Sequence, residues 1–324
     1  MAKYLIVGDL QLQTSNIDKA KRLFSIIESY GLPVIWLGDM LEKRGLVEAN
    51  CLNILYDYFY RSKLKHYVVV GNHDLLGVHS EETALEPLKA LDNVYIHDKP
   101  DCAEDIIVMP YFRNPQKFLA TIESFGRAKT QGRILICHQG IREFTIGSGY
   151  TEEDAIELKD VAQFKLALVG HYHTPKQCSN VVYLGSPFSH SFGESNENKR
   201  LAILDTDTCM LEYIPTNFSR HITIERTLPL QEPIEVRYFG FGESKTLADF
   251  YRAIISGTEE ELKVFQSEVA PMFSGVKFIY KVVNAKCQVI ISENLTNNDK
   301  FVKWAKEVKN LDDSTINVGL ELLK

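Results

Sequence analysis

Five short apolar runs, each followed at once by polar residues, restrict the fold of this chain more than any other feature. They are YLIVGD (4–9), VIWLGD (34–39), YVVVGNHD (67–74), ILICH (134–138) and LALVGHYH (166–173). Such runs, rich in β-branched and aromatic residues, are typical of strands buried on both faces. Amphipathic helices are predicted at 17–30, between an Asn16 cap and Gly31, and at about 46–60. The opening is therefore β-α-β-α-β, an α/β fold that begins with a parallel sheet.

The pattern changes after residue 173 to short strands separated by turns. VVYLGS, RLAILD and CMLEYIP predict a second sheet packed on the first. An extended stretch at 220–233 marks a domain boundary. Beyond it we expect a small α+β unit with strands at 234–241, 276–283 and 288–292 and helices at about 247–255 and 259–273. A last helix, from about residue 299, has one apolar face, which in isolation favours docking on its own domain.

Composition narrows the class of protein without naming a substrate. The 324 residues carry 36 Lys and Arg against 43 Asp and Glu, a net charge of −7, so any nucleic-acid contact must rest on local basic patches, metal ions or a partner. The six cysteines are scattered without a C-x-x-C pair, which predicts reduced thiols and no disulfides. No run is long enough for a signal peptide or a membrane span. We expect a cytoplasmic protein.

The polar residues at the run ends carry the chemistry. In an α/β sheet, groups at the carboxyl ends of the strands converge on one crevice. The residues at these ends are Asp9, Asp39, Asn72, His138, His171 and His173. Carboxylates, an amide and imidazoles without a thiolate form a ligand set that Mn²⁺, Fe or Zn²⁺ accepts. One bridging carboxylate can hold two such ions, which clamp the attacking and leaving oxygens of a phosphoryl transfer. The alternative interpretation is that these polar residues are simply exposed after the turns that end the strands. It would account for the polar end of any single run, but it does not account for all five runs together.

The order of these motifs resembles a known family. D-x-Q (Asp9, Gln11), G-D-x-x-E (38–42), G-N-H-D (71–74), a single His138 and G-H-x-H (170–173) look like the calcineurin-like metallophosphoesterases. GHYHTPKQ, followed by VVYLGSPFSHSFGE (181–194), resembles more narrowly the SbcD-type nuclease subunit of SbcC–SbcD and MRN-type complexes, including phage recombination exonuclease subunits. The resemblance implies a β-sandwich flanked by helices, in α-β-β-α layers, with an α+β capping domain and a C-terminal helical tail. The expected domains are 1–225, 226–293 and 294–324.

The resemblance also implies roles for single residues. Asp9, Asp39 and His173 would hold one metal ion, while Asp39, Asn72, His138 and His171 would hold the other. His73 would protonate the leaving oxygen, a role that suits imidazole because its ordinary pKa lies near 7, although a structural histidine is the alternative. Asp74 is a second candidate catalytic residue beside His73. Asp74 and Glu42 would also orient the metal ligands by accepting hydrogen bonds from them.

Gln11 departs from the family pattern, which has His at that position. A glutamine carbonyl is a weaker donor to a transition metal than imidazole, so Gln11 either holds the first ion loosely or leaves its place to a water. Four candidate DNA contacts lie near the motif loops: His190, Arg113, Arg142 and Lys176. Solvated charge is the alternative for the basic ones. Phe301, Trp304 and Val308 on the last helix are candidates for partner binding.

The ligand set and the resemblance together predict a metal-dependent DNA nuclease, and the resemblance implies a two-metal exonuclease and endonuclease that acts on DNA ends in recombination, repair or replication. The resemblance implies Mn²⁺ or Mg²⁺ as cofactors, double- or single-stranded DNA as substrate, and an SbcC-type ATPase as partner. A homodimer is compatible with the sequence, and a membrane role is not expected. In a phage protein the compartment would be the host-cell cytoplasm. Two alternatives stay open, namely a phosphatase or phosphodiesterase acting on another phosphoester, and a scaffold that has lost the chemistry.

Overall fold

The computed structural model describes residues 2–103, 105–126, 130–144, 155–229, 249–273 and 275–283. These residues form two compact units. The first runs to Ile222 and includes Asp249, and the second begins at Thr223 and resumes at Phe250. The expected tail with Phe301, Trp304 and Val308, and the expected strands at 234–241 and 288–292, lie outside the described residues. Within those ranges no helix has the length and apolar character needed to cross a membrane.

The first sheet of the larger unit has the strand order β12-β11-β1-β2-β3-β4. Its strands are β1 (Lys3–Val7), β2 (Val34–Trp36), β3 (His66–Val69), β4 (Val94–His97), β11 (Arg200–Asp205) and β12 (Met210–Pro215). Strands β1 to β4 are parallel, and β11 and β12 extend the β1 edge antiparallel. Our placement of RLAILD and CMLEYIP in the second sheet was wrong. Long-range pairing, such as Tyr4 with Leu204, decides which sheet a strand joins, and apolar patterning does not encode it.

The second sheet has the order β5-β6-β7-β8-β10-β9. Its strands are β5 (Asp101–Ala103), β6 (Ile106–Met109), β7 (Ile134–His138), β8 (Leu166–Gly170), β9 (Lys176–Cys178) and β10 (Val181–Tyr183). The inner four are parallel, with β5 and β9 antiparallel at the edges. Three of the five motif-bearing runs therefore belong to the first sheet and two to the second. The five cysteines within the described ranges are free.

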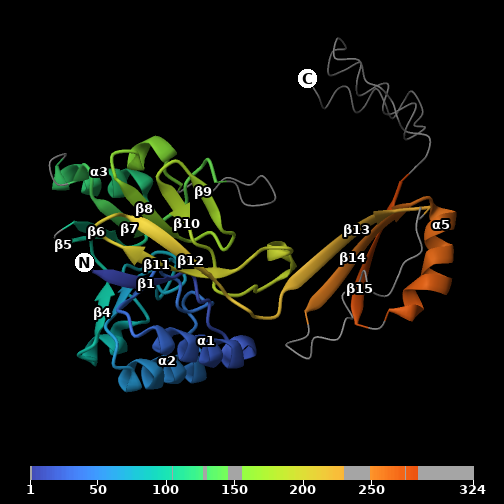
Figure 1. The fold of residues 1–324 in the computed structure, drawn as a ribbon, viewed down its shortest axis with the longest axis horizontal. Helices are drawn as coiled ribbons and strands as arrows, with labels where there is room; N and C mark the ends of the chain where they lie inside the picture. The colour runs from blue at the N-terminus through green and yellow to red at the C-terminus, as the bar shows by residue number, and fades with distance from the viewer. Residues whose placement is uncertain are drawn as a thin grey trace, which may run out of the picture. The chain divides into compact units, whose positions relative to one another are not determined.

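Helices cover the outer faces of the two sheets (Figure 1). Helices α1 (Ile17–Tyr30) and α2 (Ala49–Arg61) pack on the first sheet, and α3 (Pro115–Phe125) packs on the second. Side chains alternate along β1, so Leu5 and Val7 face the helices while Ile6 packs between the sheets with residues such as Ile136 of β7. This alternation produces the predicted α-β-β-α layers, and the predicted fold class is confirmed.

Helix α1 has the predicted span, but its start differs from the expectation. Its buried face consists of Ala20, Leu23, Phe24 and Ile27, and it ends at Gly31, whose φ of 63° requires the left-handed conformation that glycine adopts easily. The side chain of Asn16 does not cap the helix. Its amide donates to the Gln11 carbonyl at 2.8 Å, and its Oδ1 accepts from the Gln13 N–H at 3.0 Å. Asn16 therefore holds the loop that carries Gln11. Short 3₁₀ turns occupy Thr14–Asn16, Glu86–Ala90, Leu158–Val161 and Phe192–Glu194.

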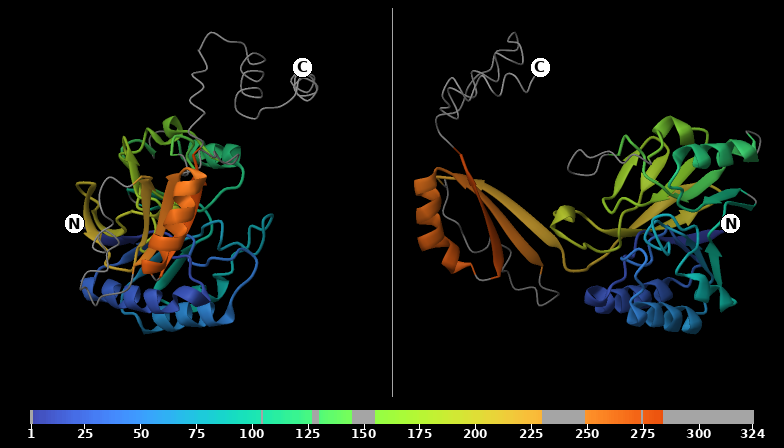
Figure 2. Two further views of the ribbon diagram at one scale, coloured as in Figure 1. Left: turned by 90° about the vertical axis from the view of Figure 1, so that its right-hand side faces the viewer. Right: turned by 180° about the vertical axis from the view of Figure 1, so that it is seen from behind.

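The second unit is a three-stranded sheet, β13 (His221–Thr227), β14 (Phe250–Gly257) and β15 (Val276–Val282), with helix α5 (Glu259–Val264) packed on it (Figure 2). A π turn at Phe265–Val269 and a 3₁₀ turn at Ala270–Met272 continue from α5. The predicted helix at 247–255 was wrong. Ala253, Ile255 and Gly257 are buried at alternate positions, which is the period of a strand, and α5 begins only at the Thr258 cap.

Candidate active site

The two sheets bring their carboxyl ends to one rim. From the first sheet, Asp9 and Gln11 follow β1, Asp39 follows β2 and Asn72 follows β3, while from the second sheet His138 ends β7 and His171 and His173 follow β8. Backbone contacts join the two groups. The Asp9 carboxylate accepts from the His171 N–H at 2.7 Å, and the His138 ring bonds to the Leu37 carbonyl at 2.8 Å. The structure thus gathers strand-end residues from both sheets.

One group of side chains is tight enough to hold a cation. A carboxylate oxygen of Asp39 and a ring nitrogen from each of His138 and His171 lie within 4.8 Å of one another. Asn72 Oδ1 lies between the two imidazoles, 3.0 Å from His138 Nε2 and 2.8 Å from His171 Nδ1. This is a carboxylate, an amide oxygen and two imidazoles, a donor set that borderline divalent ions accept.

The His138 ring is held in a defined orientation. Its Nδ1–H donates to the Leu37 carbonyl, and its Nε2 faces the Asp39 carboxylate at 3.3 Å. Burial by itself lowers the pKa of His138, but the charges of Asp39 and Asp9 outweigh it and raise the pKa to about 9. Burial likewise acts to raise the pKa of Asp39, and the neighbouring imidazoles, His138 above all, bring it below its usual range. Nε2 is therefore the His138 atom oriented toward the cluster.

Two buried oxygens beside this group lack hydrogen-bond partners. Asp9 uses Oδ1 for the His171 N–H, and its Oδ2 is buried without a partner. Gln11 donates from Nε2 to Asp39 Oδ2 at 3.0 Å, and its Oε1 is likewise buried without a partner. An unsatisfied buried acceptor costs about 1–3 kcal/mol, so acceptors that persist in a built site indicate a missing donor or cation. The residues around Asp9 and Gln11 therefore fit a second divalent ion.

The backbone is strained where the site residues sit. Gln11, Asp39 and His171 have φ values of 48°, 49° and 100°, a region that costs a non-glycine residue about 1–3 kcal/mol. Gly71 approaches Asp39 so closely that an added Cβ would lie 2.2 Å from the Asp39 Oδ1. Such strain persists only where the surrounding structure enforces it, and it is typical of functional sites.

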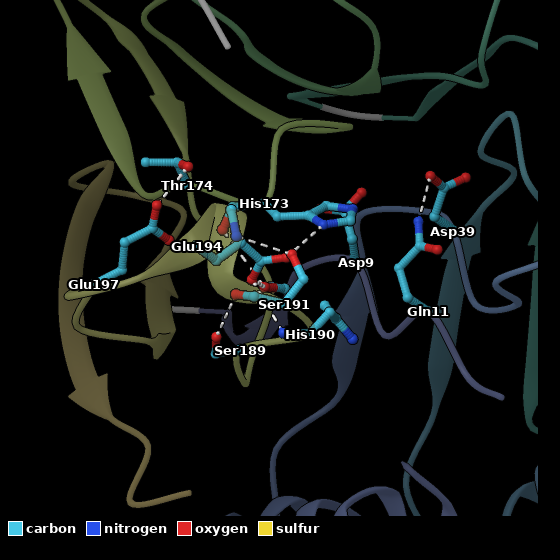
Figure 3. Close-up of polar contacts among 12 residues, drawn as sticks. Asp9, Gln11, Asp39, His173, Thr174, Ser189, His190, Ser191, Glu194 and Glu197 are labelled. Carbon is cyan, nitrogen blue, oxygen red and sulfur yellow. Dashed lines mark hydrogen bonds and ion pairs between the residues drawn. The ribbon is translucent and has the colours of Figure 1, made fainter. Parts of the chain in front are cut away.

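Glu194 and Lys199 lie at the site, although the sequence motifs assign no role to either of them. Glu194 Oε1 lies 3.0 Å from His173 Nδ1 (Figure 3). The other oxygen, Oε2, pairs at 2.7 Å with the buried Lys199 ammonium. Burial favours the neutral imidazole of His173, but Glu194 and Asp9 raise its pKa above the ordinary value. The contact directs the His173 Nε2 away from Glu194. The signal was present in the sequence, since Glu194 ends the GSPFSHSFGE stretch, but nothing in that stretch names its partner.

His73 and Asp74 lie on the loop after β3 and make different contacts. The His73 N–H donates to Asp39 Oδ1 at 2.8 Å, and its ring Nδ1 contacts the Glu42 carbonyl. The Asp74 carboxylate accepts from the Leu41 and Gly71 N–H groups, at 3.1 and 3.0 Å. Asp74 therefore fastens the two loops, and burial and the Asp39 charge raise its pKa. Burial also raises the pKa of the half-buried Glu42.

The other residues selected from the sequence lie in varied surroundings. His190 is beside the site, with its ring centroid 5.3 Å from that of His173, and burial lowers its pKa to about 3. Arg113 donates to the Val78 carbonyl and Arg142 to the Ala155 carbonyl, so both guanidinium groups hold neighbouring loops. Lys176 lies on the edge strand β9. Tyr111, which the sequence did not suggest, stacks on His171 with centroids 6.1 Å apart.

Comparison with known proteins decides the family. The family model described as calcineurin-like phosphoesterase matches residues 2–192. The chain belongs to this family. It is a metal-dependent phosphoester hydrolase, and the family implies divalent metal ions, for which the tight group at Asp39 is a candidate site. The chain is also 25% identical over 282 residues to exonuclease subunit 1 of Enterobacteria phage T4, covering 83% of this chain and 79% of that protein.

Two further relatives are viral. A putative phosphoesterase, 078R, of invertebrate iridescent virus 3 is 24% identical over 210 residues, covering 60% of each chain. A putative phosphoesterase, 244L, of invertebrate iridescent virus 6 is 25% identical over 228 residues, covering 65% of this chain and 79% of the relative. The predicted family and enzyme class are confirmed by these comparisons.

Proposed function

We propose that the protein is a two-metal DNA nuclease that acts on DNA ends in recombination, repair or replication. The observation that carries the proposal is the length of the similarity to the phage exonuclease subunit. It spans 282 residues, whereas the family model matches residues 2–192. The similarity thus extends beyond the part that all calcineurin-like phosphoesterases share. The contact between His173 and Glu194, at the end of the stretch that resembles the SbcD-type subunits, agrees with it.

The residues divide into two proposed metal sites that share Asp39. Asn72, His138 and His171 would hold one ion with Asp39, and Asp9, Gln11 and His173 would hold the other with it. For Gln11 the buried, unpartnered Oε1 supports a role as a weak oxygen ligand. When bound, such ions, Mn²⁺ or Mg²⁺, activate a water and neutralise charge on the phosphate.

His73 is the proposed general acid. The contact between its Nδ1 and the Glu42 carbonyl keeps a proton on Nδ1 and sets the ring orientation. In the imidazolium form Nε2 carries a second proton, which it would deliver to the leaving oxygen, and the neutral ring with its proton on Nδ1 remains. The His73 N–H donates to Asp39 Oδ1 at 2.8 Å, which fastens the loop of the proposed acid to the proposed metal ligand. Asp74 supports both residues by fastening the two loops.

An assay on two substrates tests the function. In the presence of Mn²⁺, the purified protein should degrade linear duplex or single-stranded DNA. The cleavage should stop when a chelator is added. His73→Ala and Asp39→Ala should remove this activity and exclude a contaminating nuclease. Turnover of a chromogenic phosphoester with no DNA cleavage would instead support a phosphatase or phosphodiesterase, and no metal-dependent turnover of either would support a scaffold.

We propose that an SbcC-type ATPase controls access to DNA and binds the C-terminal segment that contains Phe301, Trp304 and Val308, in the cytoplasm of the cell or phage host. Deleting residues 296–324 should abolish co-purification with the ATPase while sparing manganese-dependent cleavage. Complex formation by the truncated protein would exclude the segment as the main docking element.

A further inference from the structure

Three buried polar atoms near the candidate site lack hydrogen-bond partners. They are Asp9 Oδ2, Gln11 Oε1 and His190 Nε2. The two oxygens belong to the proposed first metal site, but the imidazole comes from the loop after β10, far along the chain. An acceptor lone pair on a buried imidazole costs free energy unless something binds it.

Contacts place His190 beside Asp9 and His173. The His190 ring centroid lies 5.3 Å from the His173 ring, and the Asp9 backbone interacts with the His190 ring electrostatically (Figure 3). The Nε2 of this ring is buried without a hydrogen-bond partner within the described ranges. Phe188 packs on the ring with centroids 5.0 Å apart.

The Glu194 carboxylate contacts the His173 ring and the His190 backbone. Its Oε1 contacts His173 Nδ1 at 3.0 Å, and its Oε2 accepts from the His190 backbone N–H at 3.3 Å. Lys199 holds the same carboxylate in place at 2.7 Å. The Glu194 carboxylate therefore links the His173 ring to the backbone of the loop that carries His190.

His190 shares one feature with a metal-binding imidazole, which is a buried ring nitrogen that no protein group among the described residues satisfies. Such a ring bonds through one nitrogen to a backbone carbonyl or carboxylate, which fixes the tautomer and leaves the other nitrogen for the ion. His66 in the core, by contrast, has both nitrogens satisfied, by the Trp36 N–H and the Ser62 hydroxyl. His190 differs from His66 in the unpartnered Nε2.

We propose that His190 Nε2 is a ligand of the first divalent ion, together with Asp9, Gln11 and His173. A second imidazole offsets the weak donor character of the Gln11 carbonyl, because imidazole binds borderline divalent ions better than a neutral amide oxygen does. The inference rests on the proposed two-metal function.

Calorimetric titration of the full-length protein with Mn²⁺ tests the inference, with bound ions counted by electron paramagnetic resonance. The wild type should bind two ions. His190→Leu, which preserves volume but removes both nitrogens, should weaken one site by at least about 10-fold and leave the other unchanged. His221→Leu is the matched control, because the His221 ring bonds to Ser189, which is the neighbour of His190 in the chain. This substitution should leave both Mn²⁺ affinities unchanged.

A rescue experiment separates a lost ligand from a disturbed fold. Adding Gln11→His to His190→Leu returns an imidazole to the site and should recover most of the lost affinity. Unchanged affinities in His190→Leu would overturn the role of His190 but not the two-metal function. An equal loss of affinity in His221→Leu would do the same, and so would a loss in His190→Leu that Gln11→His does not restore. A wild type that binds no Mn²⁺ would overturn the proposed two-metal function as well.

Discussion

Replacing Glu194 by glutamine should weaken metal binding at the site that contains His173. The Glu194 side chain is 9% exposed, and its Oε1 is 3.0 Å from His173 Nδ1. A carboxylate behind a ligating imidazole increases its basicity and fixes its orientation, and losing such a partner costs on the order of 10- to 100-fold in affinity. This range equals about 1.4 to 2.8 kcal/mol. Because Glu194 is buried and charged, we expect the upper half of the range.

The natural control is Glu197→Gln. Glu197 accepts from Lys199 at 2.7 Å, as Glu194 does, and it also accepts from the Thr174 hydroxyl. In the part of the chain that the structure describes, Glu197 makes no polar contact with His173. Both substitutions remove one negative charge from the same buried lysine. Only Glu194→Gln also removes it from the imidazole.

Mn²⁺ affinity measured by calorimetry, together with the midpoint of thermal unfolding, distinguishes the possibilities. We expect a loss of affinity in Glu194→Gln at one site only, with Glu197→Gln within about twofold of the wild type. Equal losses in the two variants would mean that the charge around Lys199 matters and the contact with His173 does not. Unchanged affinity in Glu194→Gln would refute the role of the carboxylate altogether.

Three further expectations follow from particular contacts. His73→Gln should lower kcat about 10²- to 10⁴-fold while leaving Mn²⁺ affinity intact, and a parallel loss of affinity would assign His73 to metal binding instead. Gln11→His alone should tighten Mn²⁺ binding at the first site, whereas unchanged affinity by calorimetry would mean that Gln11 is not a ligand. Burial lowers the pKa of His66 from an ordinary 6.5 to about 3. Between pH 3 and pH 6.5, His66 is therefore protonated in the unfolded chain and neutral in the folded protein. The His66 contribution to the free energy of unfolding should therefore be constant above about pH 6.5 and decline toward pH 3. Denaturant titrations of wild type and His66→Gln should converge as the pH falls, and a constant difference would contradict the assignment.

Local patterns in the sequence were sufficient for much of the fold and for the choice of candidate residues. The apolar runs that end in Asp9, Asp39 and His138 predicted strands, and the period of α1 predicted a helix that the structure places at Ile17–Tyr30. These signals are local, because the periodicity of buried side chains follows from the geometry of a single strand or helix. The family, the fold class and the enzyme class are confirmed, while the individual metal and catalytic roles stay predictions.

Non-local contacts account for what the sequence reading missed. Strand β11 could not be assigned to a sheet from its own residues, because its partner β1 lies almost 200 positions earlier. The helix expected at 247–255 was wrong because pairing with β15 outweighs local propensity in β14.

Which side chains stand at the strand ends follows from neighbouring residues, because the periodicity of apolar positions is a local property of the chain. Which of these side chains lie within reach of one another depends on the folded arrangement of the two sheets. This arrangement joined Asp39 to His138 and His171 across two sheets, set Glu194 behind His173, and left Asp9 Oδ2, Gln11 Oε1 and His190 Nε2 without partners. The physical reason is that hydrogen bonding and ion binding act over a few ångströms of space, and distance along the chain does not predict that proximity.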